Sequence, residues 1–259
     1  RGLIFGVANE RSIAWGIASK ANEQGAELAF TYQGESLKKR VVPLAEKCNS
    51  SLVFECDVGS DKSIKEFFNK ISGSWADFDF LVHSIAFSDK NELKGEYIDT
   101  SRENFVNTLN ISCYSLTILS KEASKLMKNG GQILTLSYLG AERVMPHYNV
   151  MGIAKSALET SVKYLASDLG KLNIRINSIS AGPIKTLASS GISDFKYILK
   201  WNEYNSPMKR ITDIDEVGKN ALYLLSDLSS GVTGENIHVD CGYHVVGMKA
   251  VDAPDISVI

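Results

Sequence analysis

Short apolar runs alternate with longer segments of helical periodicity along almost the whole chain, and this alternation restricts the fold more than any other feature. Apolar runs of strand length, each followed by a helical segment, predict a parallel sheet with helices on both faces. The runs FLVHSI and ILTLS are almost continuously apolar, as expected for strands that are covered on both sides. Strands are predicted over Leu3–Val7, Ala26–Tyr32, Leu52–Cys56, Phe78–Ile85, Gly131–Ser137, Ile174–Ser180 and Asn236–Asp240. Helices are predicted over Ile13–Gln24, Ser36–Cys48, Ser63–Ser72, Arg102–Met127, His147–Leu169 and Val217–Leu225.

The length and composition are those of one ordinary α/β domain. We expect residues 1–259 to form a single Rossmann-like, doubly wound parallel sheet of about seven strands. The net charge of −2 gives no reason to expect nucleic acid or a membrane as a partner. No apolar run approaches the roughly 18 residues of a membrane span, and the first six residues already read as a strand rather than a signal peptide. The four cysteines are scattered without zinc-binding spacing, which favours reduced thiols in a reducing compartment such as the cytoplasm.

The first predicted strand runs into a turn that is bounded by Gly6 and Gly16. This turn lacks the middle glycine of GxGxxG and is longer than that motif. Ser12 and Ile13 stand at the start of the following helix, where backbone N–H groups and the helix dipole favour a pyrophosphate. The alternative is a tight turn with Ser12 as the helix N-cap, and this segment alone leaves the two interpretations about equal.

The ends of the next three strands carry further candidates for a nucleotide site. Gln33 stands where a dinucleotide site often has an acidic residue for the ribose, and it offers hydrogen bonds without charge. A basic run at residues 38–40 could meet a 2′-phosphate, but a solvated helix is the better interpretation, which favours NADH over NADPH. Asp57 could bind an adenine amino group or cap the next helix. His83 lies inside an apolar strand and is predicted to be a core histidine rather than a catalytic one.

Tyr148 and Lys155 are the strongest candidates for catalysis. Seven residues make nearly two helical turns, so the two side chains would share one face of the helix predicted over 147–169. A buried lysine beside a phenol favours the phenolate and supplies a fixed positive charge. The alternative is an aromatic residue at a helix start with a lysine on the polar face, and the spacing alone favours that alternative.

The surrounding motifs resemble those of the short-chain dehydrogenases/reductases, and among these the bacterial-type enoyl-[acyl-carrier-protein] reductases. Ordinary members of the superfamily carry Tyr and Lys four residues apart, whereas here Met151 occupies that place and Tyr148 stands seven before Lys155. This Tyr-x6-Lys spacing is typical of the enoyl reductase branch. The resemblance covers about Gly2 to Met248 and includes, in order, GVANERSIAWGIA, ELAFTYQ, CDV, HSIAF, SYLGAER, YNVMGIAKSALE and RINSISAGPIKTLA.

Carried over residue by residue, the resemblance implies a task for each matching position. Tyr148 would face the substrate carbonyl, Tyr138 would lie on the same pocket, and Lys155 would bind the nicotinamide ribose. Ser88 falls where the family has a substrate-contacting residue. Thr186 would contact phosphate within a segment, 184–188, that covers the cofactor. The implied dinucleotide contacts are Gly6, Ser12, Ile13, Gln33, Asp57, Val58, Ser84, Ile85, Lys155, Ile184, Thr186, Leu187 and Ala188.

The resemblance also implies a reaction and a set of partners. The reaction is NADH-dependent reduction of the trans-2 double bond of an enoyl thioester, the last step of the fatty-acid elongation cycle. The thioester would be carried on acyl carrier protein, and no metal is expected. A homotetramer built from dimers is expected, with the long helices at an interface. Two alternatives remain open: another oxidoreductase of the superfamily that acts on a carbonyl or hydroxyl, and a dinucleotide-sensing protein without turnover.

The segment at about 186–207 is expected to form a lid over the substrate. It is rich in aromatic residues, and family resemblance favours a lid over a surface helix that packs on the core. Lys196 and Lys200 stand one turn apart in it. They could dock the acidic carrier protein or simply lie on a solvated face.

Overall fold

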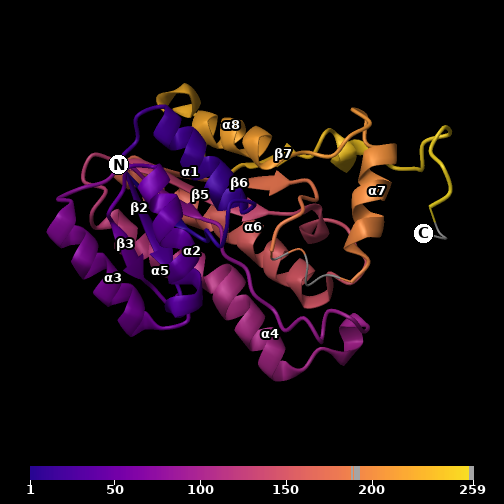
Figure 1. The fold of residues 1–259 in the computed structure, drawn as a ribbon, viewed down its shortest axis with the longest axis horizontal. Helices are drawn as coiled ribbons and strands as arrows, with labels where there is room; N and C mark the ends of the chain where they lie inside the picture. The colour runs from indigo at the N-terminus through magenta and orange to yellow at the C-terminus, as the bar shows by residue number, and fades with distance from the viewer. Residues whose placement is uncertain (188, 190–192, 257–259) are drawn as a thin grey trace.

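The computed structural model describes residues 1–187, 189 and 193–256. Within these residues, seven parallel strands form one sheet in the order β3-β2-β1-β4-β5-β6-β7, so the winding reverses between β1 and β4 (Figure 1). This confirms the predicted doubly wound parallel sheet. The strands are β1 Gly2–Phe5, β2 Leu28–Tyr32, β3 Val53–Glu55, β4 Phe80–His83, β5 Gly131–Ser137, β6 Ile174–Ala181 and β7 Asn236–Val239.

Two layers of helices cover the sheet, and each layer has its own apolar core. One core contains buried residues of α1, α2 and α8, and the other contains buried residues of α3, α5 and α6. Figure 1 shows α7 standing apart from these layers, at the end of the molecule away from the N-terminus. None of the described helices is long and apolar enough to cross a membrane. The helices are α1 Ile13–Glu23, α2 Gly34–Lys47, α3 Asp61–Ser74, α4 Arg102–Leu109, α5 Ser115–Ser124, α6 Asn149–Leu169, α7 Phe195–Asn205 and α8 Ile214–Leu225.

The helical stretch predicted over 102–127 extends from Arg102 to Ser124, but a π-helical turn over Asn110–Tyr114 interrupts its regular geometry between α4 and α5. The buried hydroxyl of Ser115 donates a hydrogen bond of 2.7 Å to the carbonyl of Ile111 within this turn. Such turns insert one residue into a helix and are frequent at functional sites. Apolar periodicity does not reveal the turn, because each of the two flanking helices keeps its own helical pattern.

The helix predicted to begin at His147 begins two residues later. His147 and Asn149 both have left-handed backbone, with φ of 54° and 40°, and Tyr148 occupies the N-cap position between them. The prediction that Tyr148 and Lys155 lie within one continuous helix is therefore wrong. The helical period therefore predicts where the side chain of Lys155 points, but it does not apply to Tyr148, which precedes the first residue of α6.

The two helices α1 and α8 approach each other closely through glycines. A Cβ built on Gly16 would lie 2.4 Å from the carbonyl oxygen of Ile214, and one on Gly218 would lie 2.7 Å from the carbonyl oxygen of Gly16. Both contacts are with backbone atoms, which cannot move aside as a flexible side chain can. Any side chain at these positions therefore separates the helices and disturbs the core between them.

A Gly16→Ala substitution should lower the free energy of unfolding by about 1–3 kcal/mol, the usual effect of overpacking. Gly73→Ala is the matched control, because Gly73 is also helical but has open space around its Cβ position. That control should raise stability by about 0.5–1 kcal/mol through the lower flexibility of alanine. Urea unfolding of the two variants and the wild type measures both effects. Equal stability of Gly16→Ala and the wild type would contradict this account of the α1–α8 contact.

Candidate active site

A cavity of about 990 Å³ opens at the carboxyl edge of the sheet, where the winding order reverses. Ligands of doubly wound sheets bind at this reversal. All the described residues that the sequence predicted for cofactor and substrate line this one cavity. They are Gly6, Ser12, Ile13, Gln33, Asp57, Val58, Ser84, Ile85, Ser88, Tyr138, Tyr148, Lys155, Ile184, Thr186 and Leu187. Ala188 lies outside the described residues.

Gly6 is required by the close approach of the first and fourth strands. It follows β1 with φ of 99°, and a Cβ there would lie 1.9 Å from the carbonyl oxygen of Ser84, which follows β4. The backbone of the two strand ends therefore forms a floor without side chains at this point. Such a floor is what a dinucleotide needs in order to lie across the sheet edge.

Ser12 holds the turn that follows Gly6. It is the N-cap residue of α1, but its side chain makes no capping bond to that helix. Ser12 is only 7% exposed. Its hydroxyl instead accepts hydrogen bonds from the backbone N–H groups of Ala8 and Asn9 at 3.0 and 3.1 Å. The turn is thereby held in shape in front of the helix N-terminus, a place that favours an anion. The predicted N-cap position of Ser12 is confirmed, and its place in a pyrophosphate site stays a prediction.

Asp57 and Gln33 line the cavity close to the ends of β3 and β2. The Asp57 carboxylate accepts from the N–H of Gly59 at 2.9 Å, whereas the N-cap of α3 is Ser60. The alternative that Asp57 caps the next helix is therefore wrong. Beside Gln33, the carboxylate of Glu55 accepts from the N–H of Gly34 at 3.2 Å. The sequence analysis did not identify this negative charge.

Most of the basic run at 38–40 is exposed on α2, as predicted. The Lys38 ammonium pairs with Glu35 at 3.0 Å, and hydrogen bonding to that carboxylate raises the pKa of the lysine. The positive charge nearest to Gln33 is thus already matched by a carboxylate of the same helix.

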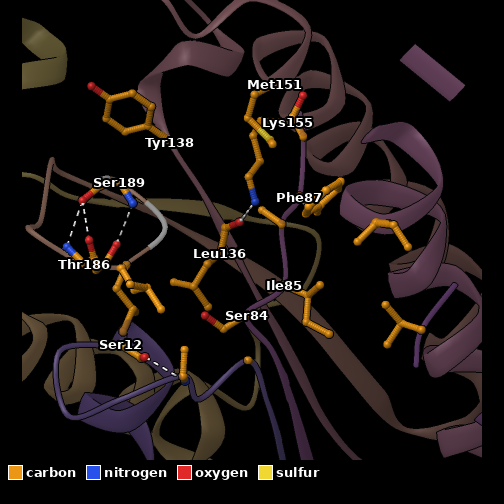
Figure 2. Close-up of a pocket in the computed structure, with 18 of the residues that line it drawn as sticks. Ser12, Ser84, Ile85, Phe87, Leu136, Tyr138, Met151, Lys155, Thr186 and Ser189 are labelled. Atoms are coloured by element: carbon orange, nitrogen blue, oxygen red, sulfur yellow. Dashed lines mark hydrogen bonds between the residues drawn. The ribbon is translucent and has the colours of Figure 1, made fainter. Parts of the chain in front are cut away.

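Lys155 is a buried cation that reaches into the middle of the cavity. Its side chain is 6% exposed and donates a hydrogen bond of 2.6 Å to the carbonyl of Leu136 at the end of β5 (Figure 2). Burial lowers the pKa of Lys155 to about 8, although the charges of Cys113 and Glu159 oppose this shift. The ammonium is therefore charged at neutral pH and loses its charge in mildly alkaline solution.

Tyr148 is fixed by contacts with two residues of the segment after β5. Its ring meets the ring of Tyr138 edge-on, with centroids 5.1 Å apart. A Cβ on Gly140 would lie 2.3 Å from a ring carbon of Tyr148, so only glycine leaves room for the phenol. The motif SYLGAER therefore shapes the site as well as supplying Tyr138.

Burial raises the pKa of Tyr148 well above its ordinary value, and the charges of Tyr138 and Glu159 raise it further. The expectation that Lys155 favours a phenolate is therefore wrong, because burial opposes charge on the phenol. Tyr148 is held as a neutral O–H donor. Burial likewise raises the pKa of Tyr138, whose hydroxyl is buried without a hydrogen-bond partner among the described residues.

Met151 occupies the place one turn before Lys155 where ordinary short-chain dehydrogenases carry tyrosine. It is 7% exposed and lines the same cavity (Figure 2). A thioether can accept a weak hydrogen bond but has no proton to donate. Tyr148, by contrast, is a buried phenol on this cavity, and the hydroxyl of Tyr138 on the same cavity is buried as well.

Ser88 belongs to a small polar cluster on one wall. Its hydroxyl lies 3.2 Å from the amide nitrogen of Asn104 and 3.0 Å from the hydroxyl of Thr108, both on α4. Sequence reasoning missed these two partners. Asn104 and Thr108 are four residues apart, which places them on one face of a helix, and this spacing was the available signal in the sequence.

His83 is a core residue, as predicted. Its ring is fully buried between Thr135 and Ser115, at 2.8 and 2.7 Å, and burial lowers its pKa to about 3. It therefore stays neutral and holds β4 to β5 and α5.

The described part of the predicted lid consists mainly of α7. Trp201 on this helix donates a hydrogen bond of 2.8 Å to the hydroxyl of Tyr243, which ties the helix to the segment after β7. Phe195 at the start of α7 lines the cavity, as do Thr186 and Ser189, which exchange hydrogen bonds with each other (Figure 2). These three residues thus belong to the cavity wall, and the lid stays a prediction.

Comparison with known proteins identifies the family. The chain matches the family model described as Enoyl-(Acyl carrier protein) reductase over residues 6–244. Enoyl-[acyl-carrier-protein] reductase [NADH] 1 of Rhizobium meliloti (strain 1021) is 64% identical over 259 residues, which cover 100% of this chain and 95% of that protein. The enoyl-[acyl-carrier-protein] reductase [NADH] of Rickettsia typhi is 59% identical over 247 residues, which cover 95% of each.

Solved structures agree with the sequence comparison. The enoyl-(acyl-carrier-protein) reductase of Anaplasma phagocytophilum, in complex with NAD, matches with a TM-score of 0.94 and 60% identity over 98% of this chain and 95% of that one. The Bacillus cereus enoyl-acyl carrier protein reductase, with NADP+ and indole naphthyridinone, matches with a TM-score of 0.93 and 51% identity over 95% and 97%. With the fold, the cavity and its motifs in agreement, the chain belongs to the enoyl-[acyl-carrier-protein] reductase family.

Proposed function

We propose that this chain uses NADH to reduce the trans-2 double bond of enoyl thioesters, in the last step of the fatty-acid elongation cycle. One observation carries the proposal: a buried, protonated phenol and a buried lysine, Tyr148 and Lys155, line one cavity, with Met151 in the place of the ordinary catalytic tyrosine. The names of its close relatives support the same reaction and cofactor.

Tyr148 is proposed to stabilise the charge that develops on the substrate. When bound, NADH would supply the hydride for Cβ of the enoyl thioester; negative charge would then gather on the thioester oxygen until a proton taken up at Cα completes the reduction. A phenol that burial keeps protonated can donate to that oxygen. This hydrogen bond strengthens as the charge develops, so it lowers the barrier rather than merely tightening binding. Tyr138, whose hydroxyl lacks a partner among the described residues, is proposed to order the substrate beside it.

Lys155 is proposed to bind the nicotinamide ribose with its ammonium group. Its place between Leu136 and the cavity supports this role, because the carbonyl uses only one of its three N–H donors. The turn from Gly6 to Ile13 and the segment at 184–188 are proposed to bind the pyrophosphate, with Asp57, Val58, Ser84 and Ile85 toward the adenine half.

NADH is the proposed cofactor in preference to NADPH. Gln33 brings no charge, Lys38 is paired with Glu35, and the Glu55 carboxylate lies beside the backbone of residue 34. A 2′-phosphate placed there would be repelled by the Glu55 carboxylate, and the ammonium of Lys38 is already paired with Glu35.

The substrate is proposed to arrive on acyl carrier protein, with residues 186–207 as its lid and Lys196 and Lys200 as candidate docking cations. The working form is proposed to be a homotetramer of single-domain subunits in the cytoplasm. Exposed apolar side chains on α4, α6 and the turn between α4 and α5 support such an assembly; they are Val106, Tyr114, Ile153 and Tyr164.

The proposed activity is tested by following oxidation of NADH in the presence of a 2-enoyl thioester. Tyr148→Phe should lower kcat about 10²–10³-fold, because it removes one oxyanion donor. Its dissociation constant for NADH should remain unchanged. Tyr223→Phe, a change of an exposed tyrosine on α8 outside the cavity, is the matched control and should retain full activity. Turnover of a 3-oxoacyl thioester without enoyl reduction would favour a carbonyl reductase, and tight NADH binding with neither activity would favour a sensor.

Binding of NADH should weaken as the pH rises through about 8, because Lys155 is charged below that pH and neutral above it. Lys155→Arg should keep its charge, so its dissociation constant should stay level up to pH 10. Lys155→Met should bind weakly at every pH. Lys163→Met, an exposed change on the same helix, should follow the wild type. A pH-independent wild type would show that the ammonium does not contribute to cofactor binding.

The cofactor preference is tested at Glu55. The wild type should have a lower kcat/KM with NADPH than with NADH. Glu55→Gln should raise the NADPH value by about twofold to fivefold, the range of exposed charge interactions, and leave the NADH value unchanged. Glu66→Gln on α3 controls for the loss of a surface carboxylate. Equal NADPH kinetics in Glu55→Gln and Glu66→Gln would remove Glu55 from the explanation.

A further inference from the structure

Tyr148 lies between two residues that are each held in an unfavourable backbone conformation. His147 has φ of 54° and Asn149 has φ of 40°. The left-handed region is uncommon for residues other than glycine, although asparagine and histidine enter it more often than most. Such a conformation persists only where contacts around the residue hold it in place. The contacts of these two side chains therefore identify the segments to which the turn at Tyr148 is bonded.

Asn149 ties the turn to the loop between β4 and α4. Its side-chain amide donates hydrogen bonds to the carbonyls of Glu92 and Gly95, at 3.3 and 2.9 Å. Between these two carbonyls lies Leu93, which is 6% exposed and lines the cavity. The carboxylate of Glu92 in turn accepts two hydrogen bonds from Ser101, the N-cap residue of α4. The loop is thus bonded to the N-cap of α4 through the Glu92 carboxylate and to Asn149 through two backbone carbonyls.

His147 ties the turn to the start of α7. Its Nε2 lies 3.1 Å from Oδ2 of Asp194, the residue just before this helix. An aspartate in that position ordinarily accepts from the first N–H groups of its helix. Here the side chain makes no capping bond, and Asp194 itself has left-handed backbone. The next residue, Phe195, lines the cavity.

We propose that His147 and Asn149 are positioning residues for Tyr148, which fix its phenol relative to two apolar walls of the cavity. Each residue is adjacent to Tyr148 in the chain, and each bonds next to a wall residue, Phe195 or Leu93. An acyl group held by these walls would therefore be held in register with the phenol. The inference rests on the proposed function, because it assigns the phenol to a thioester oxygen.

The Asn149 tether is tested with Asn149→Gly, which removes the amide but permits the left-handed backbone. This variant should lower kcat/KM for a 2-enoyl thioester about twofold to tenfold, the effect of one or two lost hydrogen bonds. The dissociation constant for NADH should not change. Asn173→Gly is the matched control, because Asn173 also has left-handed backbone but ends a short helix that does not line the cavity. Asn173→Gly should change the melting temperature by about as much as Asn149→Gly does, without lowering kcat/KM.

The His147 tether is tested by a double-mutant cycle of His147→Asn and Asp194→Asn, since asparagine tolerates the backbone of both positions. Each change should lower kcat/KM about twofold to fivefold, as expected for a partly exposed pair, and the double variant should lose no more than either alone. Asp215→Asn, which breaks an exposed ion pair of α8, is the control for a lost carboxylate and should leave the kinetics unchanged.

Three results would overturn the inference: losses that multiply in the double variant, equal losses in NADH binding, or kinetics that match those of Asn173→Gly and Asp215→Asn. If Asn149→Gly does not fold, the His147 cycle decides the outcome by itself. A wild-type protein that does not reduce enoyl thioesters would refute the proposed function and this inference together. An active wild type with unaffected variants would refute the inference alone.

Discussion

The close approach of the β1 and β4 ends is the constraint on which the rest of the site depends. Residue 6 must have a positive φ and no Cβ, because the carbonyl of Ser84 occupies the space that a side chain would need. At the same point the winding order of the sheet reverses, so the helices that follow the two strands lie on opposite faces. The edge between them is left open, and the cavity forms there without a separate domain.

Burial then gives the two central side chains their chemical character. It opposes charge on both, so Tyr148 remains a neutral phenol while the pKa of Lys155 falls to about 8. Lys155 keeps its charge at neutral pH because its pKa, although lowered, still lies near 8. The pKa of the Tyr148 phenol is raised, so the phenol is even further from ionisation than an ordinary tyrosine. At neutral pH the cavity therefore contains a neutral phenol O–H donor, Tyr148, and a lysine that remains a cation although its pKa is lowered, Lys155.

Two places where the helices depart from regular geometry lie beside this pair. The π-helical turn at Asn110–Tyr114 brings Asn110 and Ile111 to the cavity, and the left-handed residues on either side of Tyr148 place it at a cap rather than in a helix. Both departures are held by contacts with residues distant in sequence or by buried hydroxyls. Irregular backbone at a functional site is expected where side chains must be aimed in directions that a regular helix does not offer.

The sequence alone predicted the order of strands and helices and the family. It also predicted a set of contact residues, and all of those that the structure describes line the cavity. Local periodicity decides the elements, and motifs such as YNVMGIAK decide the family because many positions must match in register. Tertiary structure alone decided three further matters: the division of the helix predicted over 102–127, the cap position of Tyr148, and the neutrality of its phenol. Each of these depends on contacts or burial between segments far apart in the chain. The partner of His147, for example, lies 47 residues away at Asp194, and no local pattern records that contact.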